Sequence, residues 1–362
     1  MTDTTGTQPT ESVLTEKRGS LGVITLNRPR AVNALNSEMM QLMNAALDDF
    51  EQDAGITAVL LRGAGERGLC AGGDVVALYK ATGENPDQGV DFFRVEYTLN
   101  LRISRYPKPF ISLMDGLVLG GGVGVSAHSS HRIVTEGTRT GMPETVIGFC
   151  PDVGGLNILA RAPQNLGRLM AVTGLHVTGA DALAVGMADY FVPSEKLDDL
   201  VATLEKVEGA DAVAQVLEGF AEQAPPSQLV ENAHWIEGAF AADTVEEILE
   251  KVQVVADSGA EGAEFAGTVL AALQKNGPTG MKVALEAVRR AGSQSLAETL
   301  NQDFVTSCNA LAHHDMREGI RAQVVDKDRN PQWCPASLAE VSRESVLAFF
   351  TPTKAGELGL KS

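Results

Sequence analysis

Cysteine is scarce in this 362-residue chain, which holds only Cys70, Cys150, Cys308 and Cys334 and has no CxxC pair. This spacing argues against a disulfide framework and a zinc site, and it fits a reducing compartment, so we expect a cytoplasmic protein. Long apolar runs are also absent, and no membrane-spanning helix is expected. Residues 1–16 are rich in threonine and lack an apolar stretch, which predicts a frayed tail and not a signal or transit peptide.

Basic residues are few, because 29 Lys and Arg stand against 47 Asp and Glu and give a formal net charge of −18. A surface of this sign repels nucleic acids and anionic membranes, so neither is expected as a partner. An anionic ligand would have to be held by local groups. The hydrophobic content of 44% is ordinary for a well-packed globular protein of one large domain with an appendage, or of two domains.

Short β-rich runs alternate with helical segments from Leu21 to about Leu200, which is typical of an α/β layer structure. The spacing of apolar residues in Asn36–Asp53 predicts an amphipathic helix capped by Asn36 or Ser37. After about Glu205 the composition shifts to Ala, Glu, Leu and Gln, which predicts a mostly helical half. The expected strands are Leu21–Leu26, Thr57–Arg62, Pro109–Met114 and His131–Thr135.

Two glycine-rich stretches follow expected strands. Residues 63–68 read formally as GxGxxG, but the glycines continue to Gly73, so we expect a long loop and a helix from Asp74 or Val75, not a dinucleotide fold. The second stretch, residues 115–128, places three consecutive glycines at a strand-to-helix junction. Their uncovered backbone N–H groups can bind an anion or a developing oxyanion, and no Lys-Ser or Lys-Thr follows as a P-loop requires. Two such loops that converge would form an oxyanion hole.

Several motifs together resemble the crotonase (enoyl-CoA hydratase/isomerase) superfamily: Asn27-Arg28-Pro29 to Asn33-Ala34-Leu35, Cys70 to Asp74, Gly120-Gly121-Gly122 and Met142-Pro143-Glu144. The resemblance implies an α/β spiral of ββα units that holds an acyl-CoA thioester with its carbonyl between two backbone N–H groups. By position, these donors are Gly73 and Gly121. Coenzyme A would then be part of the substrate, and no separate cofactor or metal is expected. The resemblance leaves the oligomeric state open between a homo-oligomer, because trimers are common in the superfamily, and a chain whose long C-terminal half replaces that packing.

The carboxylates around these motifs narrow the resemblance. Hydratases of the superfamily carry two glutamates, but here the first position is Gly124 and only Glu144 remains. Asp152 stands where hydratases usually have a small residue. Residues 142–145 and 151–155 resemble the 3-hydroxyisobutyryl-CoA hydrolase branch, and the likeness runs from about residue 19 to about residue 338. It implies three segments: a disordered tail (1–17), a ββα core (18–205) and a helical region that completes the acyl-CoA pocket (206–362).

The resemblance implies hydrolysis of a short branched 3-hydroxyacyl-CoA, above all 3-hydroxyisobutyryl-CoA in valine catabolism. Glu144 would act as nucleophile or as general base, and Asp152 would orient water or protonate the leaving thiolate. Two carboxylates in a partly dry pocket should raise the pKa of one of them. Glu96 would receive the substrate's 3-hydroxyl group. The alternatives are an enoyl-CoA hydratase or isomerase acting on another acyl-CoA, and a catalytically silent CoA-binding scaffold.

Other polar residues carry weaker signals. His128 and His131 are three positions apart without a third ligand nearby, so we interpret them as polar residues at a helix end and not as metal ligands. Cys70 is interpreted as a small buried filler. No GxSxG motif occurs, which disfavours a serine-based thioesterase. The basic residues considered for the CoA phosphates, without preference among them, are Arg28, Arg62 and Lys108.

Overall fold

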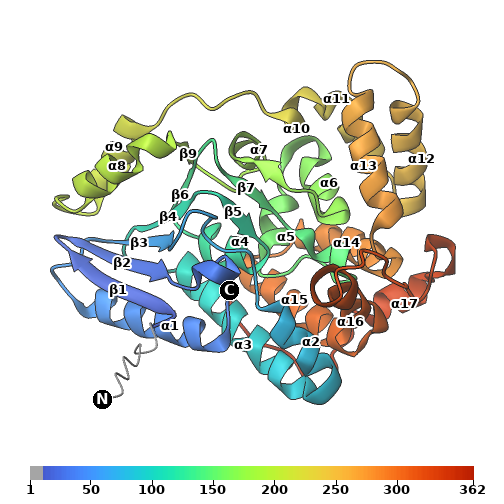
Figure 1. Cartoon of the computed structure of the whole chain (residues 1–362), viewed down its shortest axis with the longest axis horizontal. Coiled ribbons are helices and arrows are strands. Elements are labelled where there is room, and N and C mark those ends of the chain that lie inside the picture. Colours follow the sequence, from blue (N-terminus) through green and yellow to red (C-terminus); the bar gives the residue numbers. More distant parts are fainter. Residues whose placement is uncertain (1–10) are drawn as a thin grey trace, which may run out of the picture.

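The computed structural model describes residues 11–362 and contains a six-stranded sheet with the order β1-β2-β3-β4-β6-β9. All neighbouring strands in it are parallel except β1 and β2, which are antiparallel. A smaller three-stranded sheet, β5-β7-β8, lies beside it (Figure 1). The strands are β1 (Val13–Arg18), β2 (Leu21–Leu26), β3 (Ala58–Gly63), β4 (Phe110–Met114), β5 (Leu117–Leu119), β6 (His131–Val134), β7 (Arg139–Gly141), β8 (Val177–Thr178) and β9 (Tyr190–Phe191).

The four predicted strands are present, with bounds that differ by at most one residue. The prediction of a disordered tail over residues 1–17 is wrong for its last part, because Val13–Arg18 form the edge strand β1. Only Val13 of this strand is buried, so the sequence carries almost no alternating pattern there. Backbone pairing with β2 stabilises β1 instead. Residues 1–10 of the predicted tail lie outside the described residues.

Helix α1 (Ser37–Gln52) matches its prediction closely. The side chain of Asn36 caps it by accepting a hydrogen bond from the Met39 N–H at 2.9 Å. Met39, Met43, Leu47 and other apolar residues at three- and four-residue intervals are buried on one side of the helix. The helix lies against β1 and β2, as Figure 1 shows, and so forms the first crossover layer of the sheet.

The sheet is covered on both faces, which explains why its strands read as continuous apolar runs. On one face, Leu21 and Val23 of β2 join a small apolar cluster that is closed by α8 (Leu197–Leu204) and α9 (Asp211–Phe220). On the other face, Ile24 belongs to a large cluster that extends from Val13 to Val346. The sheet and the helical half therefore share one continuous core.

The half of the chain after residue 205 is helical, as predicted. Helices α12 (Val245–Ala256) and α13 (Ala263–Lys275) form a corner of the molecule at the opposite end from α8 and α9 (Figure 1). The remaining helices are α2 (Val75–Glu84), α3 (Pro86–Ser104), α4 (Gly121–Ser126), α5 (Gly155–Leu159), α6 (Leu166–Thr173), α7 (Gly179–Ala184), α10 (Gln228–Glu231), α11 (Ala233–Phe240), α14 (Pro278–Ala291), α15 (Leu296–Ala312), α16 (His314–Ile320) and α17 (Arg343–Ala348).

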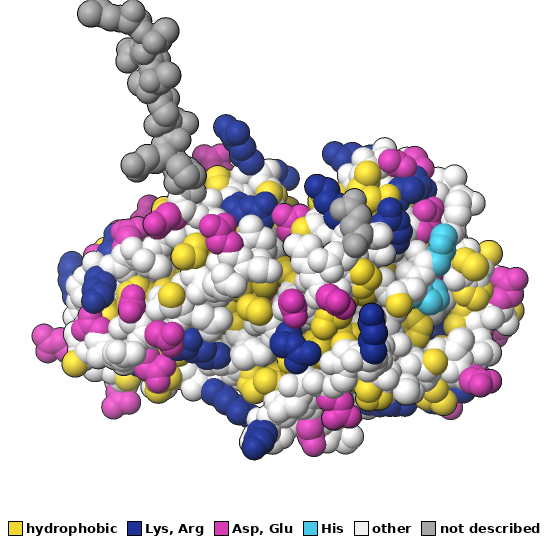
Figure 2. Space-filling model, turned by 90° about the horizontal axis from the view of Figure 1, so that it is seen from below, with side chains coloured by type: hydrophobic (Ala, Val, Ile, Leu, Met, Phe, Trp, Pro, Cys, Tyr) yellow, Lys and Arg dark blue, Asp and Glu magenta, His cyan; other side chains and the backbone are white. Residues whose placement is uncertain are grey.

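On the face seen in Figure 2, acidic and basic side chains are interspersed with apolar ones and form no large patch of one sign. Among residues 11–362, no helix combines the length and the apolar character that a membrane span requires.

Candidate active site

The two glycine-rich loops lie side by side. After β3, the chain runs without a helix until Asp74 caps α2, which confirms that the GxGxxG of residues 63–68 opens no dinucleotide-binding helix. Bridges join Gly68 to Gly116 and Cys70 to Val118, next to strand β5. The Leu119 N–H donates a 3.0 Å hydrogen bond to the carbonyl of Cys70. The first loop is thus fixed along the strand that leads into the glycine triplet.

This pairing brings the two predicted N–H donors together. Gly72 has a φ of 108°, a conformation that favours glycine, and it turns the chain so that Gly73 faces the triplet. A Cβ atom placed on Gly121 would lie 3.1 Å from the Gly73 nitrogen and 2.6 Å from Oε1 of Glu96. Neither the Gly73 nor the Gly121 N–H donates a hydrogen bond to another described residue. Both donors are therefore free to bind a carbonyl oxygen or an oxyanion.

The donors border a cavity of about 370 Å³ with a mainly apolar wall. Three elements supply its carboxylates: α3 carries Glu96, the 3₁₀ turn Pro143–Ile147 carries Glu144, and the turn before α5 carries Asp152. Their exposed fractions are only 2%, 6% and 4%, respectively. Oε1 of Glu96 and Oε2 of Glu144 have no partner among the described residues. The charged and amide side chains of the wall, together with a histidine, are Glu96, Glu144, Asp152, His176, Gln323 and Arg329.

The burial of these carboxylates changes their acidity. Loss of solvation raises the pKa of Glu96 and of Glu144 well above the usual range, and the nearby charge of Asp152 adds to both effects. Burial also raises the pKa of Asp152 to about 7, although a hydrogen bond from Tyr97 opposes this change. At neutral pH the three groups therefore share protons and do not carry three full charges.

The turn that carries Asp152 is held in a strained conformation. Val153 has a φ of 50°, which a β-branched residue rarely adopts and which costs on the order of 1–3 kcal/mol. Two contacts hold the turn: Nε2 of His128 lies 2.7 Å from the Val153 carbonyl oxygen, and the Gly154 N–H donates to Oδ2 of Asp303 at 2.8 Å. His128 therefore positions this turn. In residues 11–362, no group of three or more His, Cys, Asp and Glu side chains has a metal-binding arrangement.

Tyr97 contacts Asp152 directly, and the sequence analysis gave it no role. Its hydroxyl oxygen lies 2.6 Å from Oδ2 of Asp152 and 2.7 Å from Oγ of Ser307 on α15. Tyr97 and Ser307 are fully buried but are 210 positions apart in the chain. The one available signal was the position of Tyr97, directly after Glu96, to which the resemblance assigned a role.

Gly124 stands where hydratases of the superfamily carry the first of their two glutamates, and its surroundings leave no room for a larger side chain. Gly124 is buried in α4, and a Cβ atom there would lie 2.7 Å from Cβ of Val153 and 3.0 Å from Nδ2 of Asn100. The strained turn beside Asp152 thus occupies the space next to Gly124. A second glutamate could not be placed at this position without moving the turn that carries Asp152.

The three basic residues considered for the CoA phosphates do not line the cavity. Arg28 pairs with Asp74 at 3.0 Å, the Arg62 Nε–H donates to Oγ1 of Thr25, and Lys108 donates to the Asp53 carbonyl at 2.7 Å. Cys70 is buried, and burial raises the pKa of its thiol to about 12, which fits the interpretation as a filler.

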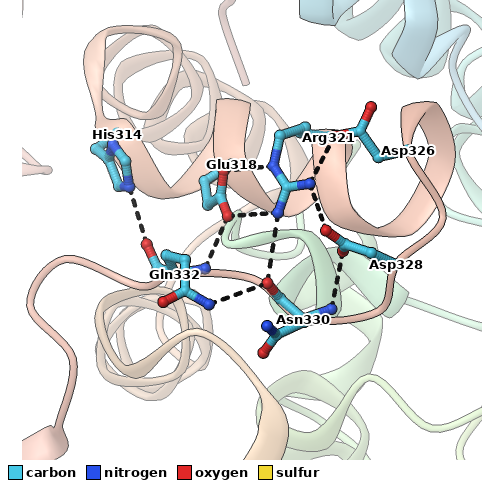
Figure 3. A network of polar contacts seen from close by, with 7 residues as sticks. All are labelled: His314, Glu318, Arg321, Asp326, Asp328, Asn330 and Gln332. Atoms are coloured by element: carbon cyan, nitrogen blue, oxygen red, sulfur yellow. Dashed lines mark hydrogen bonds and ion pairs between the residues drawn. The ribbon is translucent and has the colours of Figure 1, made fainter.

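Arg329 is the arginine that lines the cavity, and it lies on a loop, residues 326–332, that is fixed by Arg321 (Figure 3). The Arg321 guanidinium donates to Glu318 at 2.8 Å, to Asp326 at 2.7 Å and to Asp328 at 2.6 Å. The Gln332 N–H donates to Glu318 as well, at 2.7 Å. We name Arg321 and these three carboxylates the arginine clamp.

Comparison with known proteins places this arrangement in context. The sequence model of the enoyl-CoA hydratase/isomerase family matches residues 21–350. The chain is 38% identical over 361 residues to the mitochondrial 3-hydroxyisobutyryl-CoA hydrolase of Bos taurus, covering 97% of this chain and 92% of that protein. The corresponding protein of Homo sapiens is 37% identical, with the same coverage. Both relatives are named as mitochondrial proteins. This finding overturns the prediction of a cytoplasmic location.

Two solved structures share the whole fold. A carnitinyl-CoA dehydratase from Mycobacterium thermoresistibile is 44% identical, with a TM-score of 0.89 over 96% of this chain and 98% of that one. An enoyl-CoA hydratase from Rhodobacter sphaeroides is 36% identical, with a TM-score of 0.87 over 96% of this chain and 100% of that one. The predicted α/β fold with its helical C-terminal region is therefore confirmed.

Proposed function

This chain belongs to the enoyl-CoA hydratase/isomerase family, and from that premise we propose that it hydrolyses 3-hydroxyisobutyryl-CoA to 3-hydroxyisobutyrate and CoA. Relatives named for this thioester hydrolase match nearly the whole chain, including the helical half. Water is the second reactant, and the proposal includes no cofactor beyond the CoA of the substrate. Valine catabolism as the metabolic setting is kept as a prediction from the resemblance, and a homo-oligomeric assembly as one of its two open alternatives.

The observation that carries the proposal is that Asp152 and Glu144 line the same cavity while the position of Gly124 is closed. The two solved relatives are named as a dehydratase and a hydratase, activities that remove or add water at carbon. The superfamily pattern uses two glutamates for that chemistry, and here Val153 occupies the space next to Gly124. Instead, Asp152 supplies the second carboxyl group of the cavity from another direction. This arrangement favours attack on the thioester carbonyl over the addition or removal of water at carbon.

Each of these groups has a proposed role in thioester hydrolysis. The thioester carbonyl oxygen would accept hydrogen bonds from the Gly73 and Gly121 N–H groups, which stabilise the oxyanion of the tetrahedral intermediate. Glu144 would either attack the carbonyl carbon or remove a proton from the attacking water. Asp152 would orient this water or give a proton to the departing CoA sulfur. Two buried carboxyl groups that share a proton can supply one basic and one acidic partner at neutral pH.

In this proposal Glu96 would select the substrate. Its Oε1 has no partner within residues 11–362 and lies close to the Gly121 backbone, next to the predicted site of the carbonyl. A 3-hydroxyl group on the acyl chain would satisfy this buried oxygen, whereas an unsubstituted acyl chain would leave it unpaired. Leaving a buried polar group unpaired costs about 1–3 kcal/mol, which favours a 3-hydroxyacyl substrate.

The test compares two reactions of the purified protein. We expect rapid release of free thiol from 3-hydroxyisobutyryl-CoA and little loss of the double bond of crotonyl-CoA. Thiol release is followed with a thiol reagent, and the double bond is followed by its ultraviolet absorbance. Efficient hydration of crotonyl-CoA without thiol release would establish the alternative, a hydratase, and reject the hydrolase. Absence of both reactions across a panel of short acyl-CoAs would favour a silent CoA-binding protein.

A further inference from the structure

We propose that Tyr97 and Ser307 form a hydrogen-bond relay that holds Asp152 in one position in both of its protonation states. The proposal rests on the hydrolase function in one respect only, that Asp152 gives up and regains a proton during turnover. Tyr97 and Ser307 do not line the cavity, so they act through Asp152 and are positioning residues.

The geometry of the three hydroxyl and carboxyl oxygens carries the inference. The Tyr97 oxygen lies 2.6 Å from Oδ2 of Asp152 and 2.7 Å from Oγ of Ser307, and either Tyr97 or Ser307 can be the donor in the second contact. All three residues are buried, with exposed fractions of 0% for Tyr97 and Ser307 and 4% for Asp152. A buried hydroxyl with two partners at these distances has a fixed place but a reversible direction of donation.

Reversal of both hydrogen bonds matches the two states of the carboxyl group. When Asp152 is ionised, the Tyr97 O–H donates to it and the Ser307 O–H donates to Tyr97. When Asp152 is protonated on Oδ2, it donates to Tyr97, and the Tyr97 O–H then donates to Ser307. No bond to carbon changes and no heavy atom moves. The carboxyl group can therefore exchange a proton with the reacting groups while its orientation is preserved.

The surroundings make this relay necessary. The charged groups that act on Asp152 and Tyr97 from neighbouring elements are acids. His128 contacts the same turn at the Val153 carbonyl, but burial lowers its pKa to about 4, so it is neutral at pH 7 and an ionised Asp152 depends on hydrogen bonds for its stabilisation. A hydrogen bond to a charged group is stronger than one to a neutral group, so Tyr97 favours the ionised form. These facing acids are Glu96 on α3, Glu144 on the 3₁₀ turn Pro143–Ile147, Asp303 on α15, and Cys150 in the segment before Asp152.

The decisive variant is Tyr97→Phe, which removes one oxygen and keeps the ring that stacks on Phe93. We expect the pKa of Asp152 to rise by about one unit, because a single charge-assisted hydrogen bond is lost. The rise is measured by the ¹³C chemical shift of the Asp152 carboxyl carbon against pH in substrate-free protein, with Asp152→Asn to assign the signal. This readout does not depend on the reaction, so it separates failure of the relay from failure of the proposed function.

Kinetics supply the second readout. We expect kcat of Tyr97→Phe to fall about tenfold and the limb of the pH–rate profile that reports Asp152 to move to higher pH. Ser307→Ala should shift the same limb in the same direction by a smaller amount. The matched control is Tyr106→Phe, which removes a phenol oxygen that donates to the Leu47 carbonyl away from the cavity. It should leave both the titration and the profile unchanged.

A merely structural role would give a different result. If Tyr97→Phe lowers the melting temperature but leaves the Asp152 titration and the pH limb where they are in the unmodified protein, the relay is rejected. The relay is also rejected if Tyr106→Phe shifts the Asp152 titration as much as Tyr97→Phe does. A shifted titration without any hydrolase activity would support the relay and reject the proposed reaction.

Discussion

The three carboxylates of the cavity and the three carboxylates of the arginine clamp are the same chemical groups in opposite surroundings. In the cavity, burial raises the pKa of all three, and two of the oxygens have no partner in the described structure. In the clamp, hydrogen bonds from the Arg321 guanidinium lower the pKa of Glu318 and Asp328. Glu318 and Asp328 are thus held in the ionised form by hydrogen bonds, whereas the cavity carboxylates are protonated in part, and Glu96 and Glu144 each keep one oxygen without a partner among the described residues.

This difference separates a structural use of carboxylates from a chemical one. A carboxylate paired with arginine fixes a loop but has little tendency to accept a proton at neutral pH. A buried carboxylate without a cation costs stability, and in return its pKa lies near the pH at which a base or an acid must act. The two regions meet at Arg329, because the loop fixed by the clamp places this residue on the cavity wall.

The largest effect is expected where the chemistry is proposed. Glu144→Gln preserves the shape of the side chain but removes its basicity and its attacking oxygen. Turnover of 3-hydroxyisobutyryl-CoA should therefore fall at least about a hundredfold, the lower range for loss of a general base. The measurement is steady-state thiol release, with substrate binding followed by calorimetry and expected to change little. A matched substitution in the clamp, Glu318→Gln, should leave turnover within a few-fold, and near-normal turnover of Glu144→Gln would move the role to another residue.

The next effect concerns Asp152 and has two parts. Asp152→Asn removes one of the coupled titrations, so the pH–rate profile should lose or shift one limb and drop in height. The variant should also be more stable than the unmodified protein near pH 7. The pKa of Asp152 is about 7 in the folded protein against 3.8 when unperturbed, so the folded state loses stability as pH rises between these values.

The stability part is tested by melting both proteins between pH 4 and pH 8. The gap in their free energy of unfolding should be near zero at pH 4 and should grow to the order of 1–3 kcal/mol at pH 7. A gap of the opposite sign, or one that does not depend on pH, would show that Asp152 is a structural turn residue. In that case Glu144 and the Gly73 and Gly121 donors alone would carry the reaction.

Sequence reasoning succeeded where the determinants are local. The helix α1 follows from apolar spacing and the Asn36 cap, and the strand bounds follow from short β-rich runs between glycine loops. The motifs also placed Gly73, Gly121, Glu144, Asp152 and Glu96 around one cavity. Roles within that cavity stay predictions, because geometry shows where these groups lie and not what they do.

Residues whose role depends on contacts between distant segments could not be predicted from the sequence. Asp303 reaches the Asp152 turn across 149 positions, and Ser307 on the same helix, α15, reaches Tyr97 across 210 positions. No local pattern marks either residue. The strained φ of Val153 is imposed by its neighbours and is not a preference of valine. Arg329 was missed for the same reason, since its place on the cavity wall depends on the pairing of Arg321 with Asp326 and Asp328.

The smallest effect is expected from breaking the clamp, and its pH dependence should have the opposite sign. Arg321→Ala removes the partner of carboxylates whose pKa is lowered, so the loss of stability should be present above about pH 4 and should narrow as pH falls below it. The loss should be modest, because the ion pairs are partly exposed and screened by solvent.

A released clamp should also change substrate binding. Without Arg321, the loop of residues 326–332 is held less firmly, and Arg329 with it, so KM should rise a few-fold while kcat changes little. The control is Arg132→Ala, which breaks an ion pair with Asp189 beside the sheet and should lower stability without changing KM. Melting from pH 3 to pH 8 and steady-state kinetics at neutral pH test both parts. If Arg321→Ala lowers kcat as strongly as Glu144→Gln does, the clamp belongs to the chemistry, and the separation between structural and reactive carboxylates fails.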